Sequence, residues 1–409
     1  MVNQFFSARF RLVHLTTSVL VGSLLAASGS ACPAQPAQSS QQQIGKTAQE
    51  SNQAKPTTPG VDQSKLVRSI YELTKTTKTA KQLNEFVAKC DSALQHELNS
   101  KNTQYVTSLK GWALNLRGEK RMAVALQLKQ VGNSQFNSVL KQAMEDFDQA
   151  VVNAPERYRS WMARGSAHAQ TGKFKEAARD FTNVIKLKTE LADGWFNRAE
   201  SLYHLKQFES AITDYETVLR LQSDDAQALT GLGHSKLALG RATEALADYQ
   251  AVMKLQPQSP NVYVNAGDAY QELGNWKSAL TNFDKSISIK PTGVALQRAA
   301  WLKATCPDPS FRNPKQAISL IDRAISLTGD TVANLDTLAA AQAAVGKFDV
   351  AKSTQRKTIA LASASVEDGT TEDGTAENGT AKTGENQYTA RLALYEEEKP
   401  FTESTESSK

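Results

Sequence analysis

The sequence predicts an all-α fold in which antiparallel helix pairs stack into a solenoid, and two observations support this class. First, alanine recurs every 34 residues, and an aromatic residue follows each of these alanines after four positions. The residues concerned are Ala177, Ala211, Ala245 and Ala279, followed by Phe181, Tyr215, Tyr249 and Phe283. Second, apolar residues inside one period fall at i, i+4 and i+7, which is one face of an α-helix. A fixed period of this length is the signature of a helical repeat array.

One period contains two predicted helices separated by a turn. Gly172 ends the first helix, and Phe174 opens the second. Small residues such as Gly165 and Ala177 are needed where two antiparallel helices approach closely, and aromatic residues fill the space between them. Because each pair buries only one side, the next pair must complete the hydrophobic face. The helix-face positions of this period are Trp161, Gly165, His168, Ala177, Phe181 and Val184.

These residues resemble the tetratricopeptide repeat (TPR) family, whose repeat reads W-x2-L-G-x2-Y, then A-x3-F, then A and P. The resemblance is closest from Ala226, and it covers residues 124–362 as about seven repeats. A four-residue insertion interrupts the step at 305–314, where three prolines forbid helix. The resemblance implies a right-handed solenoid. The matching positions of the repeat from Ala226 are Leu229, Leu232, Gly233, Gly240, Ala245, Tyr249, Val252 and Pro257.

The resemblance also implies a binding surface, because in this family the first helix of each pair lines a concave groove. The expected partner is a protein or peptide, bound as an extended segment or as a helix, and no cofactor is implied. Apolar groups in such a groove supply affinity, and charged groups supply register. The groove positions in this chain are Arg159, Met162, Phe196, Glu200, Tyr203, Thr230, His234, Asp268, Gln271 and Arg298.

The segments that flank the repeats differ from them in composition. Residues 65–123 keep helical spacing but lose the period, so we expect atypical N-terminal helical repeats that cap the stack. Residues 363–387 are acidic and rich in Gly and Thr, and they are predicted to form a disordered loop. We expect a short capping helix at 388–398 and a disordered tail at 399–409.

The first 32 residues have the layout of a secretory signal peptide, because Arg9 and Arg11 precede an apolar run that ends in small residues. A membrane-spanning helix would need about 20 apolar residues, and this run is shorter, so we expect export to the periplasm or cell envelope. Cys32 directly follows the small residues GSA, which is similar to a lipoprotein signal. Two alternatives stay open: a membrane-anchored lipoprotein tethered through lipidated Cys32, or ordinary cleavage nearby. Residues 33–64, rich in Gln, Ser, Pro and Thr, are predicted to be a disordered linker.

Charge and motif content argue against other functional classes. The net charge of +5 is dispersed over 409 residues, so no nucleic-acid partner is expected. The sequence contains no nucleophile elbow, phosphate-binding loop or zinc-protease motif, so a non-enzymatic scaffold is expected. The alternative is an enzyme or ligand-transport component whose site is built from polar groove residues such as His204 and His234. A zinc site there would still require two further ligands.

Overall fold

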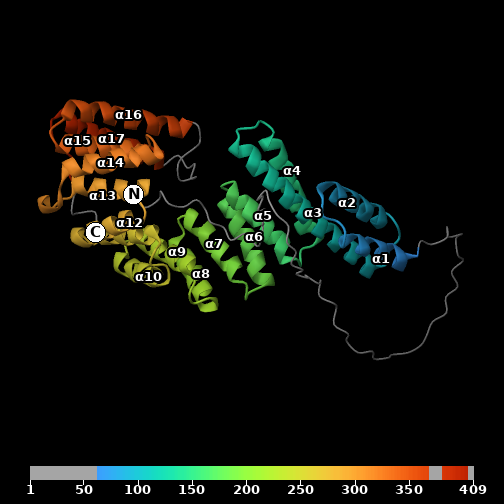
Figure 1. Ribbon diagram of the computed structural model, residues 1–409. Helices are drawn as coiled ribbons and strands as arrows, with labels where there is room; N and C mark the ends of the chain where they lie inside the picture. Colours follow the sequence, from blue (N-terminus) through green and yellow to red (C-terminus); the bar gives the residue numbers. More distant parts are fainter. Residues whose placement is uncertain (1–61, 368–379, 404–409) are drawn as a thin grey trace, which may run out of the picture. The chain divides into compact units, whose positions relative to one another are not determined.

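The computed structural model describes residues 62–367 and 380–403, which form seventeen α-helices, one 3-10 helix and no strand. The predicted all-α fold of stacked helix pairs is therefore confirmed (Figure 1). Along the sequence the chain divides into two compact units after Ala154. The predicted signal peptide, Cys32 and nearly all of the predicted linker lie outside the described residues. None of the described helices combines the length and apolar character that crossing a bilayer demands.

The N-terminal unit (described residues 62–154) contains four helices. They are α1 (Gln63–Thr74), α2 (Ala80–Leu94), α3 (Ser100–Gln130) and α4 (Phe136–Asn153). The apolar stripe of α2 is buried against α1 and α3, with Leu83 and Cys90 at 0% exposure. Helices α3 and α4 pack along each other as one elongated pair.

The predicted domain boundary between residues 123 and 124 is wrong, because α3 runs through it without a break. Gly118 lies inside this helix and does not interrupt it. Because glycine has no side chain, α3 can pack closely against α4 at this position. A Cβ at Gly118 would lie 2.8 Å from the ring of Phe147 on α4. The helix ends only before Gly132, whose φ of 63° is the left-handed conformation that glycine adopts without steric cost.

The repeat unit (described residues 155–367 and 380–403) begins with six helix pairs. The first four pairs start 34 residues apart, and Figure 1 shows their helices following one another in alternation from α5 to α12. The pairs are α5 (Tyr158–Gln170) with α6 (Phe174–Leu187), α7 (Ala192–His204) with α8 (Phe208–Leu221), α9 (Ala226–Ala238) with α10 (Ala242–Leu255), α11 (Pro260–Glu272) with α12 (Trp276–Ile289), α13 (Gly293–Thr305) with α14 (Pro314–Thr328), and α15 (Val332–Ala344) with α16 (Phe348–Glu367).

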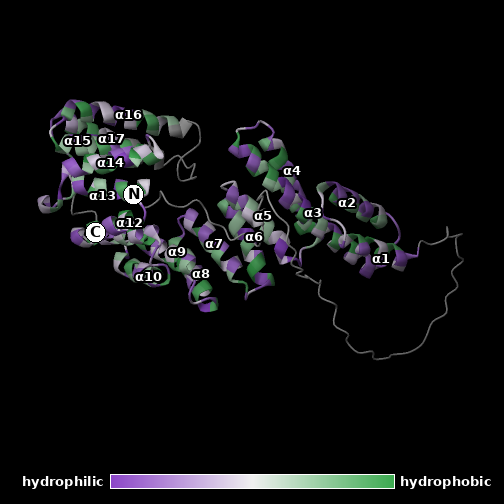
Figure 2. Ribbon diagram, in the orientation of Figure 1, coloured by the Kyte–Doolittle hydropathy of each residue, from purple (hydrophilic) through white to green (hydrophobic). Residues whose placement is uncertain are grey.

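Each of the first four pairs buries the aromatic residue of its second helix, and a small residue of a facing first helix makes room for the ring. Tyr249 and Phe283 are 0% exposed, and a Cβ built on Gly233 or Gly267 would lie 2.5 Å or 2.3 Å from these rings. The helices carry both hydrophilic and hydrophobic residues along their length (Figure 2), as expected when each helix buries one face. The small residues therefore set the distance between the two helices of a pair.

The turn inside most pairs closes with one residue in the left-handed conformation. At this residue φ is 77° for Gly172, 74° for Gly240, 68° for Gly274 and 78° for Gly346. The amide N–H of the following residue donates back to a carbonyl five residues earlier, as in Gln207 N–H to Leu202 O at 2.9 Å. This is the Schellman geometry that satisfies the last carbonyls of a helix. The second pair has Lys206 at the same position, with φ of 58°.

Lys206→Gly is expected to raise the free energy of unfolding of the repeat unit by about 0.5–1 kcal/mol, because the left-handed conformation costs an L-residue roughly 1–2 kcal/mol. Part of this gain is offset by the larger conformational entropy of glycine in the unfolded chain. The measurement is chemical denaturation of the full chain. The matched variant Gly240→Lys introduces the same strain in the next turn and should have the opposite sign. Equal midpoints for the two variants would contradict the strain argument.

The predicted insertion at 305–314 forms a short 3-10 helix, η1 (Pro309–Phe311), between α13 and α14. Asn313 then begins α14, because its side chain accepts the N–H of Gln316 and its own N–H donates to Lys303 O at 2.8 Å. The prolines interrupt the helical hydrogen bonding here, and the repeat resumes once the chain has passed them.

The predicted boundaries after residue 362 require three corrections. Helix α16 continues to Glu367, because no helix-breaking residue occurs before Gly369. A further helix, α17 (Thr380–Glu396), starts eight residues earlier than the predicted capping helix at 388–398 and packs on α16. Residues 399–403 are placed against the repeats, whereas a disordered tail was expected at 399–409. An aromatic residue and a carboxylate in this short stretch provide the contacts that hold it.

Candidate functional site

The first helices of the six pairs form one continuous surface, here called the inner row (α5, α7, α9, α11, α13 and α15). Neighbouring members contact one another along the whole series, from α5 with α7 to α13 with α15. Among the described helices, second helices of neighbouring pairs make no contacts of similar extent. Elements on the inside of a curved stack lie closer together than those on the outside, so the inner row is the concave face.

All ten groove residues that the sequence predicts lie on helices of the inner row. Their exposure divides them into two groups. Arg159 is exposed, and Thr230, Asp268 and Gln271 are half-buried. The six buried residues are Met162, Phe196, Glu200, Tyr203, His234 and Arg298. Whether any of the ten contacts a partner stays a prediction.

Helix α7 brings three of the predicted residues together against α8. The Tyr215 hydroxyl donates to Glu200 Oε1 at 2.5 Å, and the ring of Phe196 meets the Tyr215 ring edge-on at 5.8 Å. Burial, together with the nearby Glu200 carboxylate, raises the pKa of Tyr203 to about 12. Tyr203 is therefore neutral at physiological pH and acts as an apolar surface with one hydroxyl.

Helices α9, α11 and α13 carry three further candidates with ionisable side chains, His234, Asp268 and Arg298. Arg298 Nε lies 3.2 Å from Asp268 Oδ1, so these two predicted residues form one ion pair between neighbouring first helices. Burial raises the pKa of Asp268, and Arg298 offsets part of this shift. Burial lowers the pKa of His234 to about 4, partly offset by a hydrogen bond with Asn265. His234 is therefore a neutral side chain packed beside Tyr249.

The alternative of an enzyme or ligand-transport component with a site built from polar groove residues has little support among the described residues. The His204 ring stacks on Phe174 at 4.2 Å with an interplanar angle of 6°, which is a packing contact. Within residues 62–367 and 380–403, no group of three or more His, Cys, Asp or Glu side chains is arranged to hold a metal ion. Burial raises the pKa of Cys90 to about 12 and also raises the pKa of Cys306. A catalytic thiol needs the opposite shift.

The sequence analysis missed a cluster at the end of the inner row that is centred on Arg391 of α17. Arg391 is 4% exposed, and its Nη1 donates to Asp336 Oδ2 of α15 at 2.7 Å. Its guanidinium carbon lies 5.0 Å from the Trp301 ring centroid and 4.8 Å from that of Phe401. A guanidinium that lies this close to two aromatic rings gains cation–π attraction from each of them. The cluster therefore ties α13, α15 and α17 to residues that follow α17.

Residues 397–403, here called the return segment, are non-helical, and Phe401 and Glu403 of this segment contact the inner row. The Trp301 indole N–H donates to Glu403 Oε1 at 2.5 Å, and the Gln271 amide donates to Glu403 Oε2 at 3.1 Å. The backbone N–H of Glu403 donates to Thr305 O at 2.9 Å, and the Phe401 ring lies 5.8 Å from the Trp301 ring. Among the ten predicted groove residues, Gln271 is thus the one whose side chain is seen to hydrogen-bond to the return segment.

A signal for the return segment was present in the sequence. Pro400 and Phe401 stand out in a run of acidic and small polar residues, and Phe401 is the only aromatic residue after Tyr395. A large apolar side chain in a polar terminal stretch favours docking over disorder. No periodicity could indicate where it docks, because the contacts to Trp301 and Gln271 span 100 residues or more of sequence.

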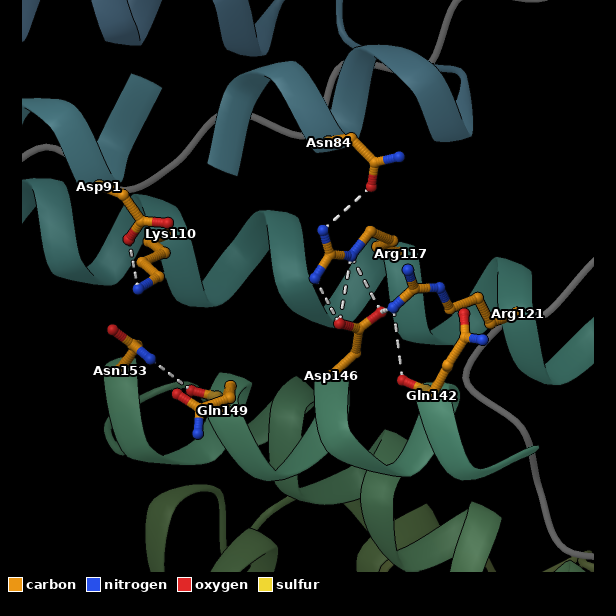
Figure 3. Close-up of polar contacts among 9 residues, drawn as sticks. All are labelled: Asn84, Asp91, Lys110, Arg117, Arg121, Gln142, Asp146, Gln149 and Asn153. Carbon is orange, nitrogen blue, oxygen red and sulfur yellow. Dashed lines mark hydrogen bonds and ion pairs between the residues drawn. The ribbon is translucent and has the colours of Figure 1, made fainter. Parts of the chain in front are cut away.

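Buried arginine–aspartate pairs are a second structural feature that the sequence analysis missed. In the N-terminal unit, Arg117 of α3 binds Asp146 of α4 through two nitrogens, and Arg121 Nη1 approaches the same carboxylate at 2.5 Å (Figure 3). Arg117 Nη1 also donates to Asn84 Oδ1 of α2 at 3.0 Å. The Asp146 side chain is only 4% exposed. Asp146 and Arg117 together therefore link α2, α3 and α4.

The repeat unit contains similar arginine–aspartate pairs, which recur at the 34-residue step. Arg164 binds Asp180 and Arg198 binds Asp214, each through two nitrogens at 2.7–2.9 Å. Each guanidinium also lies about 5 Å from the ring of the tryptophan three residues before it, which is Trp161 in the first pair. These pairs link the two helices of one repeat and leave no charge free for a ligand.

A shallow cleft of about 490 Å³ lies on the side of the second helices, between α6 and α8. Its walls carry hydroxyl groups and cations, of which Arg198 is already paired with Asp214. The lining residues include Lys175, Arg179, Thr182, Arg198, Ser210, Thr213 and Asp214. The described residues hold no peptide segment here, in contrast to the inner row.

Comparison with known proteins identifies the repeat. Family models described as tetratricopeptide repeat match residues 140–188, 163–226 and 224–292. No curated protein sequence matches the chain significantly. Three solved structures are similar over different lengths. They are yeast Tom70 (13% identity, 83% of this chain and 65% of that chain, TM-score 0.45), a tetratricopeptide repeat protein from Parabacteroides merdae (14%, 68% and 97%, TM-score 0.41), and YrrB, described as a TPR protein with an unusual peptide-binding site (24%, 42% and 85%, TM-score 0.35).

Proposed function

Because this chain belongs to the tetratricopeptide repeat family, we propose that it is a scaffold that binds an extended segment of a partner protein along its inner row. Members of this family serve as protein-interaction modules. The partner segment would run across successive first helices, whose side chains alternate between apolar anchors and polar groups.

One observation carries this proposal. The inner row already holds a non-helical segment of the chain itself, the return segment, through one backbone and several side-chain contacts. The same helices therefore present donors and aromatic rings at distances that suit a peptide.

Site-specific photo-crosslinking in cells tests the surface. A photoreactive amino acid at Arg159 or Thr230, both on the inner row, should give crosslinked partner proteins. The matched positions Glu216 on α8 and Lys285 on α12 are exposed on second helices and should give few crosslinks. Crosslinks that favour Glu216 and Lys285 would mean that the partner uses the outer face, and the inner-row proposal would be abandoned.

We further propose that the protein acts in the cell envelope after export. The support is the signal-like composition of residues 1–32, with Cys32 after three small residues. Intact mass and fractionation of the protein expressed in a bacterium distinguish the alternatives. A chain that begins at Cys32 with added acyl mass would be a membrane-tethered scaffold, and a soluble chain that has lost about 30 residues would be a free exported one. An uncleaved chain in the cytoplasm would refute export.

A further inference from the structure

We propose that the return segment is an internal competitor for the binding surface, and that the partner it imitates is an extended peptide with an aromatic residue followed two positions later by a carboxylate. This inference rests on the proposed function, because it names the chemistry of the partner at one end of the same inner row. The site for this motif, here called the end site, consists of Gln271, Trp301, Thr305, Asp336 and Arg391.

The spacing of the motif follows from backbone geometry. In an extended chain the side chains at i and i+2 point to the same side. Phe401 and Glu403 both contact Trp301, whereas Thr402 between them is exposed. Two residues of an extended segment therefore face the end site and the intervening residue faces solvent.

The aromatic position is selected by the Arg391 guanidinium and the Trp301 ring. Arg391 presents its guanidinium to Phe401 at 4.8 Å, and Asp336 holds that guanidinium in place from the other end. The Asp336–Arg391 pair is almost fully buried, with side-chain exposures of 7% and 5%. A fixed guanidinium beside an indole favours an aromatic ring over an aliphatic side chain, because only the ring offers a negative face to the cation.

The carboxylate position is selected by two N–H donors from different helices. Trp301 of α13 and Gln271 of α11 each donate to Glu403, and the Thr305 carbonyl accepts from its backbone. Indole and amide N–H groups are donors that a carboxylate satisfies and an amine cannot. The end site therefore recognises an acidic residue and excludes a basic one.

Among the described residues, the return segment contacts the inner row through Phe401 and Glu403. Burial raises the pKa of Glu403, and the two donors lower it. A covalently attached segment acts at an effective concentration on the order of millimolar. A partner that adds contacts further along the inner row can displace it.

The test measures binding of a fluorescent peptide with the sequence EEKPFTE, which copies residues 397–403, to the full-length chain. In the wild type the attached segment occupies the end site. In the double variant Phe401→Ala/Glu403→Ala the end site is vacated, and the peptide should bind about tenfold more tightly than to the wild type. Fluorescence anisotropy gives the dissociation constant of each form.

Matched variants distinguish the release of the end site from a general change in peptide affinity. Thr402→Ala alters the exposed residue between the two anchors and should bind the peptide like the wild type. Adding Gln271→Ala or Trp301→Phe to the double variant removes one donor and should reverse the gain. Glu403→Gln keeps the size of the side chain and should increase the peptide affinity by a smaller factor. It replaces the double variant in the test if the double variant is poorly folded. The control peptide EEKPATA should bind no form of the protein.

Three results would overturn the inference. The first is equal peptide affinity for the wild type and the double variant, with hydrogen exchange showing that α13–α17 remain folded in both. The second is peptide binding by the double variant that survives both donor substitutions. The third is a wild-type dimer that the double variant abolishes, since the segment would then join two copies of the chain. If any of these occurred while crosslinks at Arg159 and Thr230 persisted, the proposed function would stand without this inference.

Discussion

Asp146→Ala is expected to lower the free energy of unfolding of the N-terminal unit by about 3 kcal/mol, because it leaves two mostly buried guanidinium groups without their counter-charge. Arg117 and Arg121 both bind the Asp146 carboxylate, and their side chains are only 17% and 29% exposed (Figure 3). Removing one partner of a buried ion pair is much more destabilising than replacing both partners by apolar residues. The remaining charge is left in surroundings that solvate it poorly. Amide hydrogen exchange of α2, α3 and α4 in the full-length chain measures the loss.

The control for Asp146→Ala is Asp91→Ala in the same unit. Asp91 also binds a cation between two helices, with Lys110 Nζ at 2.5 Å, but its side chain is 48% exposed. Water screens such a pair, so the expected loss is about 0–1 kcal/mol. Losses of similar size for the two variants would show that burial does not set the strength of these pairs.

Gly267→Ala is expected to destabilise the repeat unit by about 3 kcal/mol, although alanine is the better helix former by about 1 kcal/mol. A Cβ at this position would lie 2.3 Å from Phe283 Cε1 and 2.6 Å from Cδ1. The ring is fully buried, so it has no free space into which it could move. The two helices must separate, which loosens the contact of α11 with α12. Local hydrogen exchange of these helices is the measurement, because stacked repeats need not unfold as one unit.

Two comparisons test the cause of the Gly267→Ala effect. Gly194→Ala also introduces a Cβ on a first helix, but its closest contact is 3.1 Å, to Cγ1 of Val184, which needs to move by only a few tenths of an ångström. We expect a change within about 1 kcal/mol for this variant. Phe283→Leu in the Gly267→Ala background removes the ring that the Cβ meets. The loss of stability in the double variant should be smaller than the sum of the losses in the two single variants by on the order of 1 kcal/mol or more. Additive effects would indicate that the ring is not the obstacle.

The periodic signal was sufficient to predict how the repeat unit is built. The 34-residue step of Ala177, Ala211, Ala245 and Ala279 identified the second helices, and the glycines between the helices identified the turns. These features are local, since helix faces and left-handed turns depend on residues within one turn of each other. The ten groove residues were assigned to the right helices for the same reason.

The periodic signal could not predict which groove residues would be buried or paired. Asp268 and Arg298 are 30 positions apart, and their ion pair depends on how α11 and α13 approach each other. The buried pairs of Arg164 and Arg198 did recur at the repeat step, so their period was a signal that could have been used.

The sequence by itself determined the class of fold, the period and the face of each helix, because these depend on short-range spacing. Only the tertiary structure decided the length of α3, the position of α17 and the site that holds Phe401 and Glu403. The contacts of the return segment join residues 102 and 132 positions apart. Such contacts follow no period, and they form because an aromatic ring and a carboxylate find matching groups on helices that stacking has already placed.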